Sequence, residues 1–191
     1  MTIFIAFPGY EELCHKIYNQ FKNTGSTAVL GELIIRNFPD GETFVRLNTE
    51  VKNSDVILIC GLDNPDQKAI ALMFIANFVK EQGCIRIGIV APYLGYMRQD
   101  KSFNPGEVVT SKIFAKFLSE HFDWLVTIDP HLHRYNSLSD IYSIPAKALH
   151  AAASIATWVV NNVSNPILIG PDSESDQWVS EIAGLSGLPY I

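Results

Sequence analysis

Residues 90–107 read VAPYLGYMRQDKSFNPGE and follow an apolar run, Ile85–Val90, that predicts a buried strand. Ala91-Pro92 ends this strand, because proline has no N–H to donate to a sheet. The residues that follow are too polar and too rich in turn formers for a regular element, and helical spacing resumes at Val108–Phe122. Open α/β sheets bind ligands at the carboxyl ends of their strands. We therefore expect a binding site in this loop rather than a plain solvated surface.

On both sides of this stretch, short apolar runs alternate with segments of helical spacing. This alternation predicts an α/β fold with a mostly parallel sheet flanked by helices. The expected strands are Thr2–Phe7, Val29–Ile35, Thr43–Leu47, Asp55–Cys60, Ile85–Val90, Trp124–Ile128 and Ile167–Ile169. The expected helices are one with Leu13, Ile17 and Phe21 on its apolar face, then Pro65–Gln82, Val108–Phe122, Ala148–Val163 and Gln177–Leu185.

The alternation is interrupted at Ser143-Ile144-Pro145 and then restarts. We predict a first domain over residues 1–145 and the start of a second, related domain over residues 146–191. The chain ends with Pro189-Tyr190-Ile191, which is typical of the first residues of a strand. Chain termini usually lie at the surface rather than in a new strand. We therefore expect the second domain to be incomplete and the chain to be a fragment.

Composition limits the classes of protein to which the chain can belong. Its 191 residues, 48% of them hydrophobic, can bury a sizeable core. The net charge of −6 and the lack of a basic stripe argue against a nucleic-acid partner or an anionic membrane surface. The sequence has no apolar run of about 20 residues and no signal-peptide pattern at its start. The three scattered cysteines are typical of buried thiols in a reduced compartment. We expect a soluble cytoplasmic protein.

Polar clusters follow several of the expected strands, and parallel strands would bring such clusters to one edge of a sheet. Arg98 offers a guanidinium fork suited to phosphate oxygens, and Gln99 can donate to and accept from an adenine edge. His131 and Asp172 are candidate ligands for Mg²⁺, which keeps most of its octahedral positions for waters and phosphates.

A further acidic group, Asp40-Gly41-Glu42, follows Val29–Ile35. Its carboxylates suit ribose hydroxyls or an exocyclic amine, but Asp-Gly is also a common turn.

Simpler explanations stay open for several of these residues. His131-x-His133 can be structural, or it can belong to a metal-dependent hydrolase in which the metal activates water. That site needs more ligands, and only His150 remains downstream. Ser173 followed by Asp176 also fits a helix cap. The two commonest phosphate-binding loops, GxxxxGK[ST] and GxGxxG, do not occur.

Four motifs, in this order and spacing, resemble the ribose-phosphate pyrophosphokinase family, also called phosphoribosyl pyrophosphate synthetases. They are FPDGE (38–42), YMRQDK (96–101), DPHLH (129–133) and GPDSES (170–175). The resemblance implies two phosphoribosyltransferase-like domains and transfer of the β,γ-diphosphoryl group of ATP to ribose 5-phosphate, giving phosphoribosyl pyrophosphate, a nucleotide precursor, and AMP.

The same resemblance assigns roles to residues. It implies that Arg98 and Gln99 contact ATP, and that His131 and Asp172 match Mg²⁺-associated positions. Asp40, Gly41 and Glu42 would reach the nucleotide from a neighbouring subunit, so the family likeness also implies a homo-oligomer.

The sequence departs from the family pattern in two ways. Ser102-Phe103-Asn104-Pro105 stands where the family often has a charged residue, and the Phe103 ring could stack on adenine. The ribose-phosphate loop, an acidic pair with a Thr-Gly-Gly-Thr-like turn, is missing from these residues, as is the mobile basic segment. We expect most of a nucleotide site and little of an acceptor site. The alternative is a regulatory relative without catalysis.

Overall fold

The structure, a computed structural model, describes residues 1–191 with the exception of the side chain of Glu174. It divides the chain into two compact units, Met1–Ala148 and Leu149–Ile191. We describe each by itself. The predicted relatedness of the second domain to the first stays a prediction.

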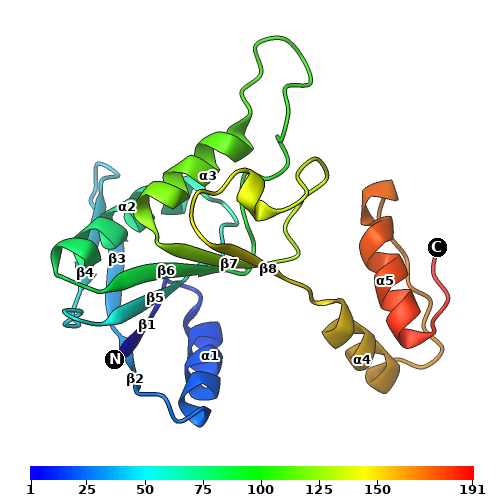
Figure 1. The fold of residues 1–191 in the computed structure, drawn as a ribbon, viewed down its shortest axis with the longest axis horizontal. Coiled ribbons are helices and arrows are strands. Elements are labelled where there is room, and N and C mark those ends of the chain that lie inside the picture. The colour runs from blue at the N-terminus through cyan, green and yellow to red at the C-terminus, as the bar shows by residue number, and fades with distance from the viewer. The chain divides into compact units, whose positions relative to one another are not determined.

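The first unit is built on a six-stranded sheet with the order β2-β1-β5-β6-β7-β8 (Figure 1). Neighbouring strands from β2 to β7 pair in parallel. The predicted α/β fold with a mostly parallel sheet flanked by helices is therefore confirmed. The strands are β1 (Thr2–Ala6), β2 (Ala28–Gly31), β5 (Asp55–Ile59), β6 (Arg86–Ala91), β7 (Trp124–Ile128) and β8 (Ala146–Leu149).

Helices cover both faces of this sheet. Figure 1 shows α1 (Glu11–Asn23) on one face and α2 (Asp66–Glu81) and α3 (Thr110–His121) on the other. Successive side chains of a strand point to opposite faces, and β1 shows this. Phe4 packs in a cluster with Cys14 of α1, whereas Ile3 and Ile5 belong to the larger cluster under α2 and α3. Burial on both faces explains why the central strands are apolar runs.

The prediction of one continuous strand over Val29–Ile35 is wrong, because the chain leaves the sheet in the middle of this range. β2 ends at Gly31, and β3 (Leu33–Asn37) pairs antiparallel with β4 (Thr43–Leu47) in a separate two-stranded hairpin. Gly31, the last residue of β2, packs closely against β1, because an added Cβ would lie only 2.9 Å from Cγ1 of Ile5. The hairpin packs against α2, and this burial cannot be deduced from a continuous apolar run.

The helix predicted over Ala148–Val163 also differs from the structure. Ala148 and Leu149 belong to β8 (Ala146–Leu149), and α4 spans Ala152–Asn162. The amide of Leu125 donates to the carbonyl of Pro145 over 2.9 Å. The open edge of β7 thus offers backbone partners that outweigh the helix propensity of the alanines.

In the second unit, α4 packs with α5 (Asp176–Ser186). The strand expected at Ile167–Ile169 is reduced to a single parallel bridge between Leu168 and Tyr190. Two further short helices are 3₁₀ turns, Leu138–Asp140 and Ser173–Ser175. Every helix in the part of the chain that the structure describes is too short or too polar to cross a membrane.

The cysteines agree with the expectation of buried thiols. Cys14 and Cys60 are buried, and burial raises the pKa of the Cys14 thiol to about 11 and that of Cys60 to about 12. Cys84 is half-buried, and its pKa is also raised by burial. These thiols are protonated at neutral pH and behave as small apolar groups.

Gly88 lies in the middle of β6, where the neighbouring strand leaves no room for a side chain. A Cβ at this position would overlap the ring of Trp124. Gly88→Ala is expected to lower the free energy of unfolding by about 1–3 kcal/mol, as overpacking does in cores.

The matched control for this substitution is Gly184→Ala in α5. A Cβ there meets nothing within 4 Å, and alanine is the better helix former by about 0.5–1 kcal/mol. Urea unfolding followed by circular dichroism measures both variants. An unchanged free energy of unfolding for Gly88→Ala would show that β7 can move away from β6.

Candidate active site

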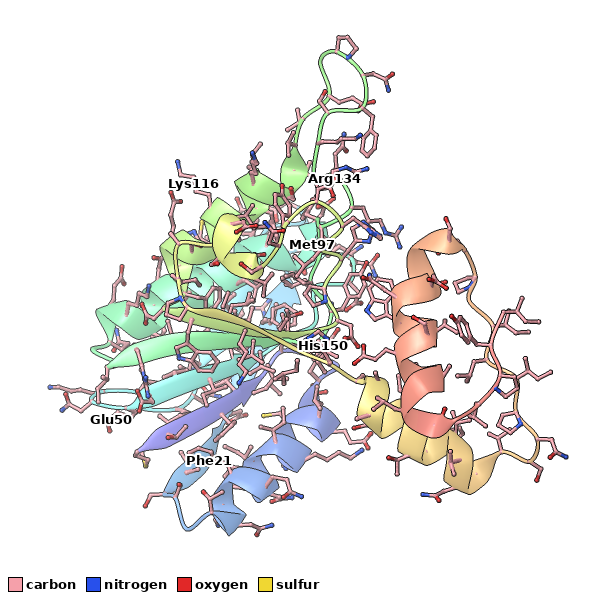
Figure 2. The ribbon with its side chains drawn as sticks, turned by 45° about the vertical axis from the view of Figure 1, so that its right-hand side comes forward. Phe21, Glu50, Met97, Lys116, Arg134 and His150 are labelled. Carbon is pink, nitrogen blue, oxygen red and sulfur yellow. The ribbon has the colours of Figure 1, made fainter. Side chains whose placement is uncertain are left out.

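Two loops define the candidate site. The Arg98 loop, residues 92–109, leaves the carboxyl end of β6, and the His131 loop, residues 129–137, leaves the carboxyl end of β7. β6 and β7 are adjacent parallel strands, so both loops start at the same edge of the sheet. Figure 2 shows Met97 of the first loop and Arg134 of the second on the same side of the sheet. The structure therefore brings together two of the predicted clusters.

The first half of the Arg98 loop is anchored to the helices. Tyr96 has a left-handed backbone, with φ of 61°, and its hydroxyl donates to Asp66 at the start of α2, which raises the pKa of the tyrosine. Met97 is buried, and the carbonyl of Gln99 accepts from the amide of Ser111 in α3 over 3.3 Å. Between these anchors Arg98 is exposed. A fixed backbone thus presents its guanidinium to solvent.

The second half of the Arg98 loop is closed by one carboxylate. Glu107 accepts from the amides of Phe103 and Asn104 and from the side-chain amide of Asn104, over 2.8, 3.1 and 2.6 Å. These bonds, led by that of the Asn104 side chain, lower the pKa of Glu107. Gln99 approaches the same carboxylate, with its Nε2 3.5 Å from Oε2. The amide of Glu107 also donates to Asn104 O over 3.2 Å, which confirms the turn predicted from Asn-Pro-Gly.

An ion pair that the sequence did not predict joins a buried carboxylate of one loop to a partly exposed guanidinium of the other. Nη1 of Arg134 lies 2.8 Å from Oδ1 and 3.0 Å from Oδ2 of Asp100. The Asp100 side chain is 0% exposed and that of Arg134 is 43% exposed. Each residue directly adjoins a recognised group, since Asp100 follows Gln99 and Arg134 follows His133. Asp100 lies inside YMRQDK and Arg134 directly follows DPHLH, but these positions do not reveal that the two residues form a pair.

Phe103 lies among cations. Its ring centroid is 5.0 Å from Nζ of Lys101 and 5.4 Å from Cζ of Arg134. The ring is 56% exposed. Stacking of Phe103 on an adenine stays a prediction, and in this arrangement the two cations already lie beside the ring.

His131 is half-buried in the His131 loop and packs edge-on against His133, with ring centroids 4.2 Å apart. The loop opens with Asp129 in the left-handed region, at φ of 40°. Non-glycine residues in this region often mark functional loops. Tyr96 shows the same feature in the Arg98 loop.

Asp172 lies in the second unit, so the structure does not test its predicted pairing with His131. It caps the 3₁₀ turn that precedes α5, where its Oδ1 accepts from the amide of Ser175 over 3.0 Å. The alternative cap formed by Ser173 and Asp176 is therefore wrong, because Asp172 and Ser175 form the capping box. Among the residues that the structure describes, no three His, Cys, Asp or Glu side chains gather in a way that could hold a metal ion.

Asp40-Gly41-Glu42 forms the turn of the β3–β4 hairpin. Gly41 has φ of 92°, and the amide of Glu42 donates to Oδ1 of Asp40 over 3.1 Å. The expectation that Asp40-Gly41 forms a turn is therefore confirmed. In Figure 1 the turn lies apart from the Arg98 loop, with α2 and α3 between them. The structure does not bring the three residues to Arg98 within one chain.

A second polar cluster, also missed from the sequence, lies at the carboxyl ends of β1 and β5. Nζ of Lys68 donates to the carbonyl of Gly61 over 2.7 Å and to Asp63 over 2.9 Å. The hydroxyl of Tyr10 donates to the same carboxylate. These groups satisfy one another, which is typical of a structural network.

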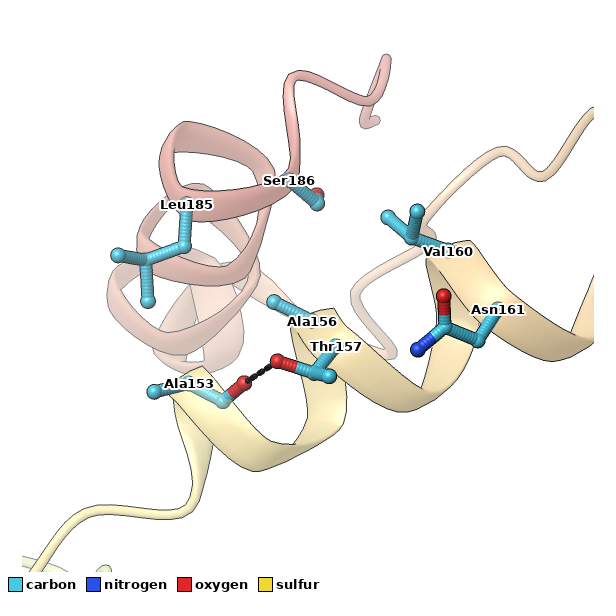
Figure 3. Close-up of a pocket in the computed structure, with 7 residues that line it drawn as sticks. All are labelled: Ala153, Ala156, Thr157, Val160, Asn161, Leu185 and Ser186. Atoms are coloured by element: carbon cyan, nitrogen blue, oxygen red, sulfur yellow. Dashed lines mark hydrogen bonds between the residues drawn. The ribbon is translucent and has the colours of Figure 1, made fainter.

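A cavity in the second unit lies between α4 and α5 (Figure 3). The hydroxyl of Thr157, which lines this cavity, donates to the carbonyl of Ala153 in the same helix over 2.9 Å. Charged side chains are not among the described residues that line it, so it does not suit a polyphosphate. The lining residues are Ala153, Ala156, Thr157, Val160, Asn161, Leu185 and Ser186.

Comparison with known proteins identifies relatives of this chain. A family model described as the N-terminal domain of ribose phosphate pyrophosphokinase matches residues 2–121. A ribose-phosphate pyrophosphokinase of Methanobrevibacter smithii is 30% identical over 151 residues, which cover 78% of this chain and 49% of that protein. One from Methanosarcina mazei is 32% identical over 167 residues, which cover 87% of this chain and 53% of that protein.

A solved structure gives the same picture for the fold. The phosphoribosylpyrophosphate synthetase from Mycobacterium smegmatis has a TM-score of 0.82 to this chain at 20% identity. The match covers 99% of this chain and 62% of that one. The chain thus spans about half the length of the curated relatives it matches. Asp40–Glu42, Arg98 and Gln99 lie inside the range of the family model, whereas His131 and Asp172 lie beyond it.

Proposed function

Because this chain belongs to the ribose-phosphate pyrophosphokinase family, we propose that it forms the nucleotide-binding part of an enzyme that transfers the diphosphoryl group of ATP to ribose 5-phosphate. The products would be AMP and phosphoribosyl pyrophosphate, a precursor for nucleotide biosynthesis. The substrates are small molecules, and the acidic chain is not expected to bind nucleic acid or membranes. We place the protein in the cytoplasm.

The observation that carries this proposal is the geometry of the Arg98 loop. Arg98 is exposed, while its neighbour Met97 is buried and Gln99 is held to α3. Phosphoryl-type transfer depends on cations positioned beside the transferring group. A guanidinium on an anchored backbone meets this need without ordering the loop on binding. Gln99 beside it offers both a donor and an acceptor for a nucleobase.

Mg²⁺ would enter with the nucleotide. It binds proteins through one or two groups and completes its shell with phosphates and waters. Asp172 uses Oδ1 in its cap, so its second carboxylate oxygen is the one that would ligate such an ion. We propose that Asp172 and His131 hold the ion, whose charge would neutralise the phosphates. Both side chains would then orient the ion and its waters rather than take part in bond breaking.

Binding of Mg·ATP to the 191-residue chain tests this function directly. Isothermal titration calorimetry with Mg·ATP is expected to show saturable binding that is lost when EDTA removes the metal. Titration with Mg²⁺ alone and with ribose 5-phosphate alone serves as control, and we expect little heat from either. A chain that binds no ATP at millimolar concentrations, while folded by circular dichroism, would contradict the proposal.

Self-association through the β3–β4 hairpin is a further expectation. Phe38 is 39% exposed, and the guanidinium of Arg36 lies 4.8 Å from its ring centroid and 4.3 Å from that of Phe44. This apolar, cation-backed tip lies next to the carboxylates of Asp40 and Glu42. We propose that the tip contacts a second copy and completes its nucleotide site.

Analytical ultracentrifugation with and without Mg·ATP measures this association. The parent chain is expected to sediment as an oligomer at micromolar concentrations, and Phe38→Ser is expected to shift it toward the monomer. Ile113→Ser, which removes an exposed apolar side chain of α3, is the control. A parent chain that remains monomeric with Mg·ATP present counts against an oligomeric site.

A further inference from the structure

We propose that Asp100 and Arg134 are positioning residues that lock the Arg98 loop to the His131 loop. Neither residue is among those that the family likeness assigned to ATP or Mg²⁺. What the locked loops bind rests on the proposed function, but the lock itself does not.

Because Asp100 is buried, its carboxylate depends on Arg134 to compensate its charge. Both of its carboxylate oxygens lie within 3.0 Å of Nη1 of Arg134, and its side chain is wholly buried. A buried carboxylate without its partner is strongly destabilising. Asp100 therefore keeps its position only while Arg134, from the neighbouring loop, stays in place.

Arg134 is held on a second side as well. Its Cζ lies 5.4 Å from the ring centroid of Phe103, which belongs to the Arg98 loop. The next residue, Tyr135, donates its hydroxyl to the carbonyl of Asp100 over 3.1 Å, and the same hydroxyl lies 2.8 Å from Oγ of Ser111. The lock therefore consists of an ion pair, a ring contact and a hydrogen-bonded tyrosine that reaches α3.

The lock acts close to the residues expected to bind the substrate. Arg98 and Gln99 directly precede Asp100, and His131 comes three residues before Arg134. Fixing Asp100 against Arg134 thus limits how far the guanidinium and the imidazole can separate. A preorganised pair of loops loses less conformational freedom when a polyphosphate binds, and small misplacements of such groups are costly.

Hydrogen exchange tests the lock without any nucleotide. In Arg134→Met and in Asp100→Asn, amides in peptides covering residues 97–103 and 129–136 are expected to exchange about 10-fold faster or more, because local opening no longer breaks the ion pair of the buried Asp100 carboxylate. Amides of β5 should be unchanged. Unchanged exchange in both loops would overturn the lock.

The matched control is Arg86→Met. Arg86 pairs with Asp55 over 2.6 Å, but this pair joins two neighbouring strands, β5 and β6, at their amino ends. Its loss should leave exchange in both loops as in the parent. If Arg134→Met does not fold, Asp100→Asn keeps the size of the buried side chain, removes its charge and carries the same test.

Calorimetry with Mg·ATP tests what the lock does. Each single variant is expected to weaken binding by about 10- to 100-fold, as the loss of groups that orient ligands commonly does. The double variant should have about the same dissociation constant for Mg·ATP as the single variant that binds less tightly. The two effects are not additive, because both substitutions break the same lock. If Asp100→Asn binds like the parent while Arg134→Met does not, Arg134 contacts the nucleotide itself and positioning is wrong. If the parent binds no ATP, the proposed function fails, and hydrogen exchange still decides the lock.

Discussion

The 191-residue chain alone is expected to form phosphoribosyl pyrophosphate at no more than a background rate, even with Mg·ATP bound. Its sequence contains no acidic pair with a Thr-Gly-Gly-Thr-like turn to hold the ribose phosphate, and no mobile basic segment to cover the transferring group. Cations at a transferring phosphoryl group are worth about 10³–10⁵ in rate. Orientation of the acceptor contributes further orders of magnitude through effective concentration. The absence of both should prevent turnover even if ATP binds at the proposed donor side of the site.

A coupled assay for AMP with ATP, Mg²⁺ and ribose 5-phosphate measures this rate. The full-length Methanosarcina mazei relative is the positive control, and the chain without ribose 5-phosphate gives the background hydrolysis. Turnover of about 1 s⁻¹ or more, an ordinary enzymatic rate, would show that the 191 residues hold a complete acceptor site. In that case, the ribose phosphate would have to bind through residues other than the missing loop.

Arg98→Ala is expected to weaken Mg·ATP binding by about 1.5–3 kcal/mol, the usual worth of a charge-assisted hydrogen bond. This corresponds to roughly 10- to 150-fold in the dissociation constant. Arg98 is exposed in the apo chain, so its removal should leave the midpoint of unfolding unchanged. The effect should therefore appear in affinity alone.

Arg86→Ala provides the control for charge. It also removes one guanidinium from the acidic chain, but from the amino edge of the sheet, where Arg86 pairs with Asp55. We expect it to bind Mg·ATP like the parent. Equal affinities for Arg98→Ala and the parent would place the phosphates elsewhere, and equal losses in both variants would reduce the effect to net charge.

The sequence predicts those strands and helices whose local pattern is compatible with only one type of secondary structure. The runs that became β5, β6 and β7 are mostly apolar and mostly buried, so their positions follow from the pattern. The β2–β3 break and β8 depend instead on partners far away in the sequence. The chain leaves the sheet after Gly31 and β8 joins the sheet at Ala146 because of packing and open strand edges that local composition does not encode.

The same division applies to the site. The closeness of the Arg98 and His131 loops follows from parallel neighbouring strands. The turn at Asp40–Glu42 follows from local Asp-Gly chemistry. The ion pair of Asp100 with Arg134 joins residues 34 positions apart, and it depends on the direction of two side chains in irregular loops. A pattern of residue types does not reveal how side chains in irregular loops are oriented.

The tip of the Arg98 loop has a practical consequence for engineering. Residues 101–106 are exposed throughout, while Glu107 and Asp100 anchor the two ends, and Figure 1 shows this loop projecting from the first unit. Exposed loop tips accept insertions and new chain ends. A short peptide tag inserted at Asn104-Pro105 would leave the paired β6 and β7 intact. Such a tag would carry a fluorophore beside the proposed nucleotide site and would report ATP binding there as an optical signal.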